Sequence, residues 1–174
     1  MVSLEDIIKA QKNISKYIYK TPQIDSIPLS KVNQKVSLKL ESIQITGSFK
    51  LRGAINKLLS LNEEQKKRGV IAVSTGNHGK GVAYAAKKLG IKSKIFMSEL
   101  VPAHRRHAIE TLGANVEIVG ANSDEADQYA RDYALKNNIE LVHPFDDLEI
   151  IAGQGTIGLE MLEAMPNVDT VIVP

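Results

Sequence analysis

A lysine at the start of an expected helix is the first residue of this sequence whose type and position suggest covalent chemistry. Residues 46–54 read TGSFKLRGA, which places Lys50 in the first turn of a helix expected over about 48–60. The positive end of a helix dipole disfavours a protonated amine, and burial against Phe49 acts in the same direction. A lysine with a lowered pKa suits Schiff-base chemistry. On this residue alone, an ordinary solvated helix lysine is the commoner arrangement.

A glycine-rich segment supplies a second group of candidate residues. Residues 74–83 read STGNHGKGVA and follow a buried apolar run at 70–74. In parallel α/β folds the ligand crevice lies at the carboxyl ends of the strands, and free N–H groups at a helix start bind anions. The glycine spacing is G-x-x-G-x-G, which is not the dinucleotide fingerprint. The segment could be an oxyanion or carboxylate cradle, or equally a glycine-rich turn capped by an asparagine. Its polar candidates are Ser74, Thr75, Asn77 and His78, and its glycines are Gly76, Gly79 and Gly81.

A third segment, residues 143–160, reads HPFDDLEIIAGQGTIGLE. Asp146 and Asp147 could be acids in a cleft, but an Asp pair before a helix is more often a cap. Gly153 and Gly155 are expected to lie at the start of a helix over about 155–165. Ordinary loop interpretations explain most of this segment.

The elements that must position these segments alternate between helix and strand. Such alternation predicts an α/β fold with right-handed crossovers, a doubly wound parallel sheet and helices on both faces. Periodicity and capping signals predict a first helix at 3–17 and a strand at 36–40. Further helices are expected at about 63–68, 77–89, 102–113 and 124–137, and strands at 70–74, 93–97, 115–119, 140–142 and 169–173.

Composition narrows the class of protein. The 174 residues carry a net charge of +2, with 43% hydrophobic and 5% aromatic residues and no Cys or Trp. No block of like charge predicts a nucleic-acid partner, and the lack of Cys excludes disulfides and thiolate sites. We expect no metal site, no signal peptide and no membrane span, and therefore a cytoplasmic protein.

Taken together, the three segments resemble the fold type II pyridoxal-phosphate enzymes, in the threonine dehydratase and serine racemase branch. Residues 38–54 match the segment that carries the family's Schiff-base lysine, and residues 74–83 match its asparagine loop. Residues 152–160 match a third block. The resemblance covers the chain beyond about residue 20, and it implies a tryptophan synthase β-like fold.

The resemblance also implies roles for individual residues. Lys50 would bind the cofactor pyridoxal 5'-phosphate and later move the α-proton. Phe49 would pack near the cofactor ring, and Asn77 would bind its phenolic oxygen. The substrate carboxylate would be held by the asparagine loop, through Ser74, Thr75, Gly76, Asn77 and His78. Thr75 keeps the hydroxyl that racemases of this family use as a second proton donor, which suggests a racemase side activity.

The implied reaction is β-elimination from a hydroxy-amino acid such as threonine or serine, giving a 2-oxo acid and ammonia. Two alternatives stay open: a serine racemase-type or other hydroxy-amino-acid lyase, and a non-catalytic module that binds an anion or amino acid. A nucleotide-binding domain is disfavoured because both dinucleotide and P-loop fingerprints are absent.

The sequence also departs from the family pattern. Family members continue after VIVP (171–174) into a glycine-rich loop around the cofactor phosphate, so we expect a fragment that binds the cofactor weakly. Residues 45–145 are expected to form the small α/β domain, whereas 1–44 and 146–174 would belong to a truncated larger domain. Family members usually form dimers or tetramers, which predicts a homo-oligomer for the full-length protein.

Overall fold

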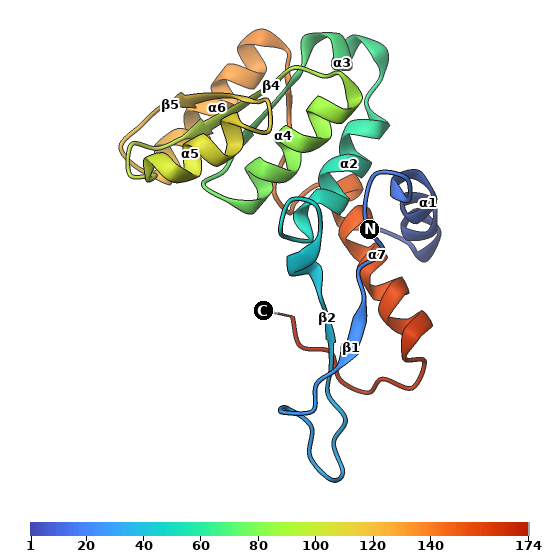
Figure 1. Cartoon of the computed structure of the whole chain (residues 1–174). Coiled ribbons are helices and arrows are strands. Elements are labelled where there is room, and N and C mark those ends of the chain that lie inside the picture. Colours follow the sequence, from blue (N-terminus) through green and yellow to red (C-terminus); the bar gives the residue numbers. More distant parts are fainter. Residues whose placement is uncertain (174) are drawn as a thin grey trace.

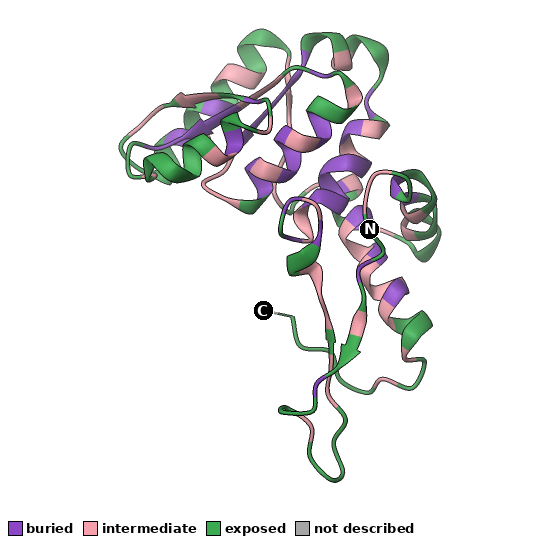
Figure 2. Cartoon of the chain, in the orientation of Figure 1, coloured by how far each residue is buried: buried purple, intermediate pink, exposed green. Residues whose placement is uncertain are grey.

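The computed structural model describes residues 1–173 as two regions of different shape (Figure 1). One region is a twisted sheet with helices packed against it. The other is a projecting hairpin beside a long helix and the C-terminal segment. Buried residues concentrate in the first region, while the hairpin tip and the last residues are largely exposed (Figure 2).

The central sheet has four parallel strands in the order β5-β4-β3-β6. They are β3 (Val70–Val73), β4 (Ser93–Met97), β5 (Asn115–Ile118) and β6 (Glu140–Leu141). Each strand lies within a segment predicted to be a strand from the sequence, at 70–74, 93–97, 115–119 and 140–142. The register pairs Ala72 with Ile95 and Ile71 with Leu141.

Helices cover both faces of this sheet, so the doubly wound α/β prediction is confirmed. Ala72 and Ile95 join one core cluster, which includes residues of α2 (Lys50–Ser60) and α4 (Asn77–Leu89). Ile71 and Phe96 point to the other face, where they pack with Ala130 of α6. Strand side chains alternate in direction, which is why neighbouring residues feed two separate cores. The remaining helices of this region are α3 (Glu63–Arg68), α5 (Ala103–Glu110) and α6 (Ser123–Asn137).

The second region contains an antiparallel pair, β1 (Gln23–Asp25) with β2 (Ser37–Lys39), and a short 3-10 helix, η1 (Glu41–Ile43). Beside it, α1 (Leu4–Ile14) packs on α7 (Leu148–Ala164). Ser3 and Asp6 form a capping box at the start of α1. β1 was not predicted, because a three-residue strand leaves little periodic signal.

Two sequence predictions in the C-terminal part were wrong. The last helix begins at Leu148 rather than near 155, because the side chain of Asp147 accepts hydrogen bonds from the backbone N–H groups of Glu149 and Ile150. The strand expected at 169–173 is not formed, since no strand within residues 1–173 pairs with it. The division into domains at 44 and 145 stays a prediction.

Within the described residues, none of the helices is long and apolar enough to cross a membrane. The same part of the chain contains no grouping of His, Cys, Asp and Glu suited to a metal ion.

Candidate active site

The candidate site lies where the direction of strand addition reverses. The chain builds β3, β4 and β5 in one direction and then crosses back to place β6 on the other side of β3. The carboxyl ends of β3 and β6 therefore flank a topological switch point, the usual ligand crevice of an open α/β sheet. The loop after β3 and the first turns of α4 hold the segment predicted as the asparagine loop (74–83). The loop after β6 (142–147) leads into α7.

Lys50 is the first residue of α2, and its amine reaches the loop after β6. The Nζ atom donates a hydrogen bond of 2.8 Å to the carbonyl oxygen of Pro144. It also lies 5.1 Å from the centre of the Phe49 ring. The side chain is half-buried, and burial lowers the pKa of Lys50 below its usual value. The direction of this shift agrees with the expectation from the sequence and favours the neutral, nucleophilic amine.

The asparagine loop is shaped by the hydroxyl of Ser74. Its Oγ atom accepts hydrogen bonds from the backbone N–H groups of Gly79 at 2.8 Å and Gly76 at 3.2 Å. A methyl group on Gly79 would lie 2.7 Å from Ile109 Cδ1 and 3.1 Å from Ser74 Cβ, so these side chains would have to shift to admit one. The hydroxyl proton of Ser74 is left free to be donated to a ligand.

The start of α4 leaves donors without partners. Its N-cap residue is Gly76, which has no side chain to accept the first N–H groups, and no acidic residue lies in the first turn. Among residues 1–173, no acceptor faces the backbone N–H groups of Thr75, Asn77 and His78. Open space surrounds the position where a side chain on Gly76 would project. An uncapped helix start of this kind attracts an anion.

His78 takes a different place from the other loop residues. Its imidazole is buried, and Nε2 lies 2.8 Å from the carbonyl oxygen of Val142 at the end of β6. Burial, together with the nearby charges of Lys50 and His143, outweighs this hydrogen bond and lowers the pKa of His78 to about 4. The neutral ring ties the asparagine loop to the loop after β6 through Nε2, and it leaves Nδ1 and the backbone N–H of His78 for a ligand.

The site residues predicted from the sequence thus come from two neighbouring helix starts. A methyl group on Gly81 would lie 3.2 Å from the backbone carbonyl of Lys50, so the first turns of α2 and α4 are in contact. Thr75 is half-buried and Asn77 is exposed, and neither side chain has a hydrogen-bond partner among the described residues. Sequence reasoning missed the carbonyl of Pro144. The only signal for it was a His-Pro pair directly after a strand end.

Comparison with known proteins identifies the family. The profile described as "Pyridoxal-phosphate dependent enzyme" matches residues 14–174. The chain belongs to this family. The catabolic L-threonine dehydratase TdcB of Staphylococcus aureus (strain USA300) is 49% identical over 176 residues, which span 100% of this chain and 51% of that protein. The chain therefore spans about half the length of the curated relatives it matches.

Solved structures of pyridoxal-phosphate enzymes have the same fold. Serine racemase from Dictyostelium discoideum is 38% identical with a TM-score of 0.89, over 97% of this chain and 55% of that one. Maize serine racemase is 32% identical with a TM-score of 0.91, over 97% and 51%. The threonine deaminase from T.th. is 41% identical with a TM-score of 0.84, over 92% and 51%.

The residues of this chain fit the family's cofactor, pyridoxal 5'-phosphate. Buried polar atoms that lack a partner cost free energy unless a ligand or water satisfies them. Three such atoms, Thr46 Oγ1, Ser48 Oγ and His78 Nδ1, belong to the segment before Lys50 and to the asparagine loop. Neither α2 nor α4 has a capping side chain or an acidic residue in its first turn. Two positive helix ends beside an amine suit an anionic aldehyde that reacts with lysine.

Proposed function

We propose that this chain forms the lysine-bearing half of a pyridoxal-phosphate-dependent ammonia-lyase. The reaction is β-elimination of water from threonine or serine, followed by hydrolysis that consumes a water, so the net products are a 2-oxo acid and ammonia. The observation that carries the proposal is the half-buried Lys50 amine, which is held by the Pro144 carbonyl at the switch point of the sheet. The identity to L-threonine dehydratase over the whole chain supports the same reaction class.

Three residues would hold the cofactor. Lys50 would bind its aldehyde through Nζ, Phe49 would pack near the ring, and Asn77 would donate a hydrogen bond to the phenolic oxygen. When bound, pyridoxal phosphate supplies an electron sink that stabilises negative charge at the substrate Cα. The lowered pKa of Lys50 favours the neutral amine, which is the form that can accept the α-proton.

The asparagine loop would bind the substrate carboxylate. Donors come from the Ser74 hydroxyl, the Thr75 hydroxyl and the free backbone N–H groups at the start of α4. A carboxylate fixed there orients the Cα–H bond, and orientation lowers the entropic part of the barrier.

The test uses pyridoxal phosphate, borohydride and peptide mapping. We expect a visible absorbance band on mixing, and, after reduction, label on Lys50 alone. Labelled protein is then assayed against unlabelled protein for 2-oxo acid formation from threonine and from serine. Label spread over many lysines would contradict the proposed site, and would favour a non-catalytic module that binds amino acids or anions.

Thr75 supports a second candidate activity. Its side chain has no hydrogen-bond partner among residues 1–173, so its hydroxyl is free to deliver a proton to Cα. We propose slow racemisation of serine beside the elimination. Chiral chromatography of the products of the whole enzyme tests this, and the absence of D-serine would refute it.

Membership of the same family supports proposals on localisation, substrate and assembly. We propose a cytoplasmic enzyme that acts on a small hydroxy-amino acid, forms a homo-oligomer and binds no nucleic acid. Residues 45–145 would form the small domain, and segments 1–44 and 146–174 would belong to the larger one. Light scattering of the whole protein tests the oligomer.

A further inference from the structure

Arg52 is fully buried, although it carries a charge and does not reach the candidate site. All five of its N–H donors form hydrogen bonds. Nε and one Nη donate to the two oxygens of Glu41, at 2.9 and 2.8 Å. Both Nη atoms donate to Glu160, at 2.7 and 2.9 Å, and one of them also donates to Thr156 at 3.1 Å. One side chain therefore joins η1, α2 and α7.

The charges of this buried network balance. Lys39 also donates to Glu160, so two cations face two carboxylates. Burial works against the charged guanidinium, but the hydrogen bonds and charges of Glu41 and Glu160 outweigh it and raise the pKa of Arg52. A balanced buried network of this kind is weak evidence for stability, because apolar side chains of the same volume often serve as well. Its distinctive property is geometric, since a planar fork fixes its partners in one arrangement.

The geometry of α2 connects Arg52 to Lys50. Residues two apart on a helix point about 200° from each other, so the two side chains leave α2 on opposite sides. Lys50 reaches the loop after β6, and Arg52 reaches α7 and η1. Next to them, α2 and α7 touch through Gly53 and Gly153, where a methyl group on Gly153 would lie 2.6 Å from Gly53 Cα. The two glycines allow the close distance between α2 and α7. The hydrogen bonds of Arg52 fix the rotation of α2 about its own axis and its position along that axis relative to α7.

We propose that Arg52 is a positioning residue, which fixes the first turn of α2 against α7 so that the Lys50 amine stays on the Pro144 carbonyl. This inference rests on the proposed function only for the assignment of Lys50 as the amine that binds the cofactor. Without Arg52 the start of α2 gains freedom, and the Lys50 amine leaves its half-buried position for water. Its pKa then rises toward the ordinary lysine value. His78 on α4 is the titratable group whose charge couples to Lys50, and it is neutral above about pH 4.

The test measures the Lys50 amine directly. Whole protein is labelled with trace acetic anhydride at a series of pH values, and mass spectrometry gives the titration of each lysine. We expect Arg52→Lys and Arg52→Met to raise the apparent pKa of Lys50 toward the ordinary lysine value. Leu58→Ala, a core change in the same helix, and Lys94→Met, which breaks the ion pair with Glu117 far from α2, should leave it unchanged. An unchanged Lys50 profile in folded Arg52 variants would overturn the proposal.

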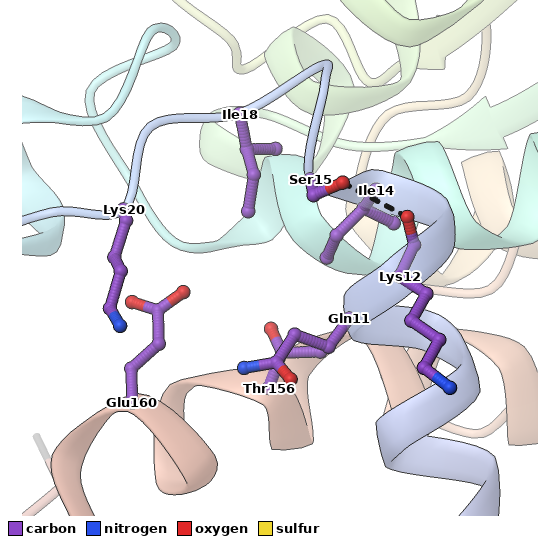
Figure 3. A pocket seen from close by; sticks show the side chains of 8 residues that line it. All are labelled: Gln11, Lys12, Ile14, Ser15, Ile18, Lys20, Thr156 and Glu160. Carbon is purple, nitrogen blue, oxygen red and sulfur yellow. Dashed lines mark hydrogen bonds between the residues drawn. The ribbon is translucent and has the colours of Figure 1, made fainter. Parts of the chain in front are cut away.

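Chemical rescue provides a second measurement. A cavity of about 350 Å³ between α1 and α7 opens onto Thr156 and Glu160, two partners of Arg52 (Figure 3). In Arg52→Ala, guanidinium chloride at a low, non-denaturing concentration should return the acetylation titration of Lys50 to that of the wild type. Sodium chloride at the same concentration should not. If the Arg52 variants do not fold, Glu41→Gln keeps an acceptor but loses a charge. Glu41→Gln should raise the apparent pKa of Lys50 by less than the Arg52 variants do. An unchanged pKa of Lys50 in Glu41→Gln would count against the proposal.

The outcome also separates this inference from the proposed function. A Lys50 amine whose pKa depends on Arg52, but which pyridoxal phosphate fails to label, would overturn the function and leave the positioning role intact. Specific labelling of Lys50 by the cofactor, with equal profiles in wild type and Arg52→Lys, would do the reverse.

Discussion

The Nζ atom of Lys50 and the carbonyl oxygen of Pro144, 94 residues apart in sequence, lie 2.8 Å from each other. This hydrogen bond joins the start of α2 to the loop after β6. That loop is also tied to the asparagine loop, because the His78 ring binds the carbonyl of Val142. Three segments that are distant in sequence thus form one site through two side-chain-to-carbonyl hydrogen bonds.

Replacing Lys50 tests the central assignment. Lys50→Arg keeps the positive charge and the helix start but cannot bind an aldehyde covalently, because the guanidinium stays protonated. We expect no borohydride-stable label and a loss of elimination activity on the order of 10³-fold or more in the whole enzyme. Lys16→Arg, an exposed lysine of the segment after α1, is the matched control and should behave as wild type. Activity retained in Lys50→Arg would refute the assignment.

Much of the fold could be predicted from the sequence because local signals agreed with tertiary packing. The β4 prediction at 93–97 matches the observed bounds, since Gly90 ends the preceding helix and the strand closes on three apolar residues, 95–97. The α7 start was missed because Gly153 and Gly155 weaken a helix pattern. In the structure those glycines are packing sites, where Gly153 meets Gly53, and a methyl group on Gly155 would lie 2.8 Å from Ile7 Cδ1.

The site was predictable only in part, for a related reason. Residue types predict Lys50 and the asparagine loop as site residues. A backbone carbonyl such as that of Pro144 has no sequence signature. The Arg52 network was equally hidden, because its partner Glu160 lies 108 residues away. The burial of His78 could not be foreseen either, since the same residue type is common in solvated loops.

A change at Ser74 should loosen the asparagine loop. Ser74→Ala removes the acceptor of the Gly76 and Gly79 N–H groups, and leaving them unpaired should cost about 1–2 kcal/mol of unfolding free energy. Urea denaturation followed by circular dichroism measures this. Ser60→Ala removes an exposed hydroxyl that donates to the carbonyl of Lys57, and it should change the free energy by less than about 0.5 kcal/mol. Equal effects of the two variants would contradict the role of Ser74.

The contact between α2 and α7 can be tested with two glycines of one helix. A methyl group on Gly153 would lie 2.6 Å from Gly53 Cα and 2.8 Å from the carbonyl oxygen of Arg52, both of which are backbone atoms. Gly153→Ala should therefore lower the unfolding free energy by about 1–3 kcal/mol. Gly158→Ala adds its methyl group to open space and should raise it by up to about 1 kcal/mol through helix propensity. The prediction fails if both variants shift the urea midpoint in the same direction.

The buried His78 should make the fold sensitive to mild acid. Its folded pKa of about 4 lies below the unfolded value of 6.5, so below pH 6.5 the unfolded chain binds a proton that the folded chain does not. Stability is therefore unaffected above pH 6.5 and falls as the pH drops toward 4, with a loss of about 2 kcal/mol between pH 7 and pH 5 from this group. The glutamine in His78→Gln cannot titrate. Between pH 7 and pH 5 the unfolding free energy of this variant should therefore fall less than that of the wild type, and the two losses should differ by about 2 kcal/mol. Urea titrations at the two pH values measure the difference, with His107→Gln, a change at an exposed histidine, as the control. Parallel losses in wild type and His78→Gln would show that the ring is protonated in the folded protein, and would remove the neutral tether between the two loops.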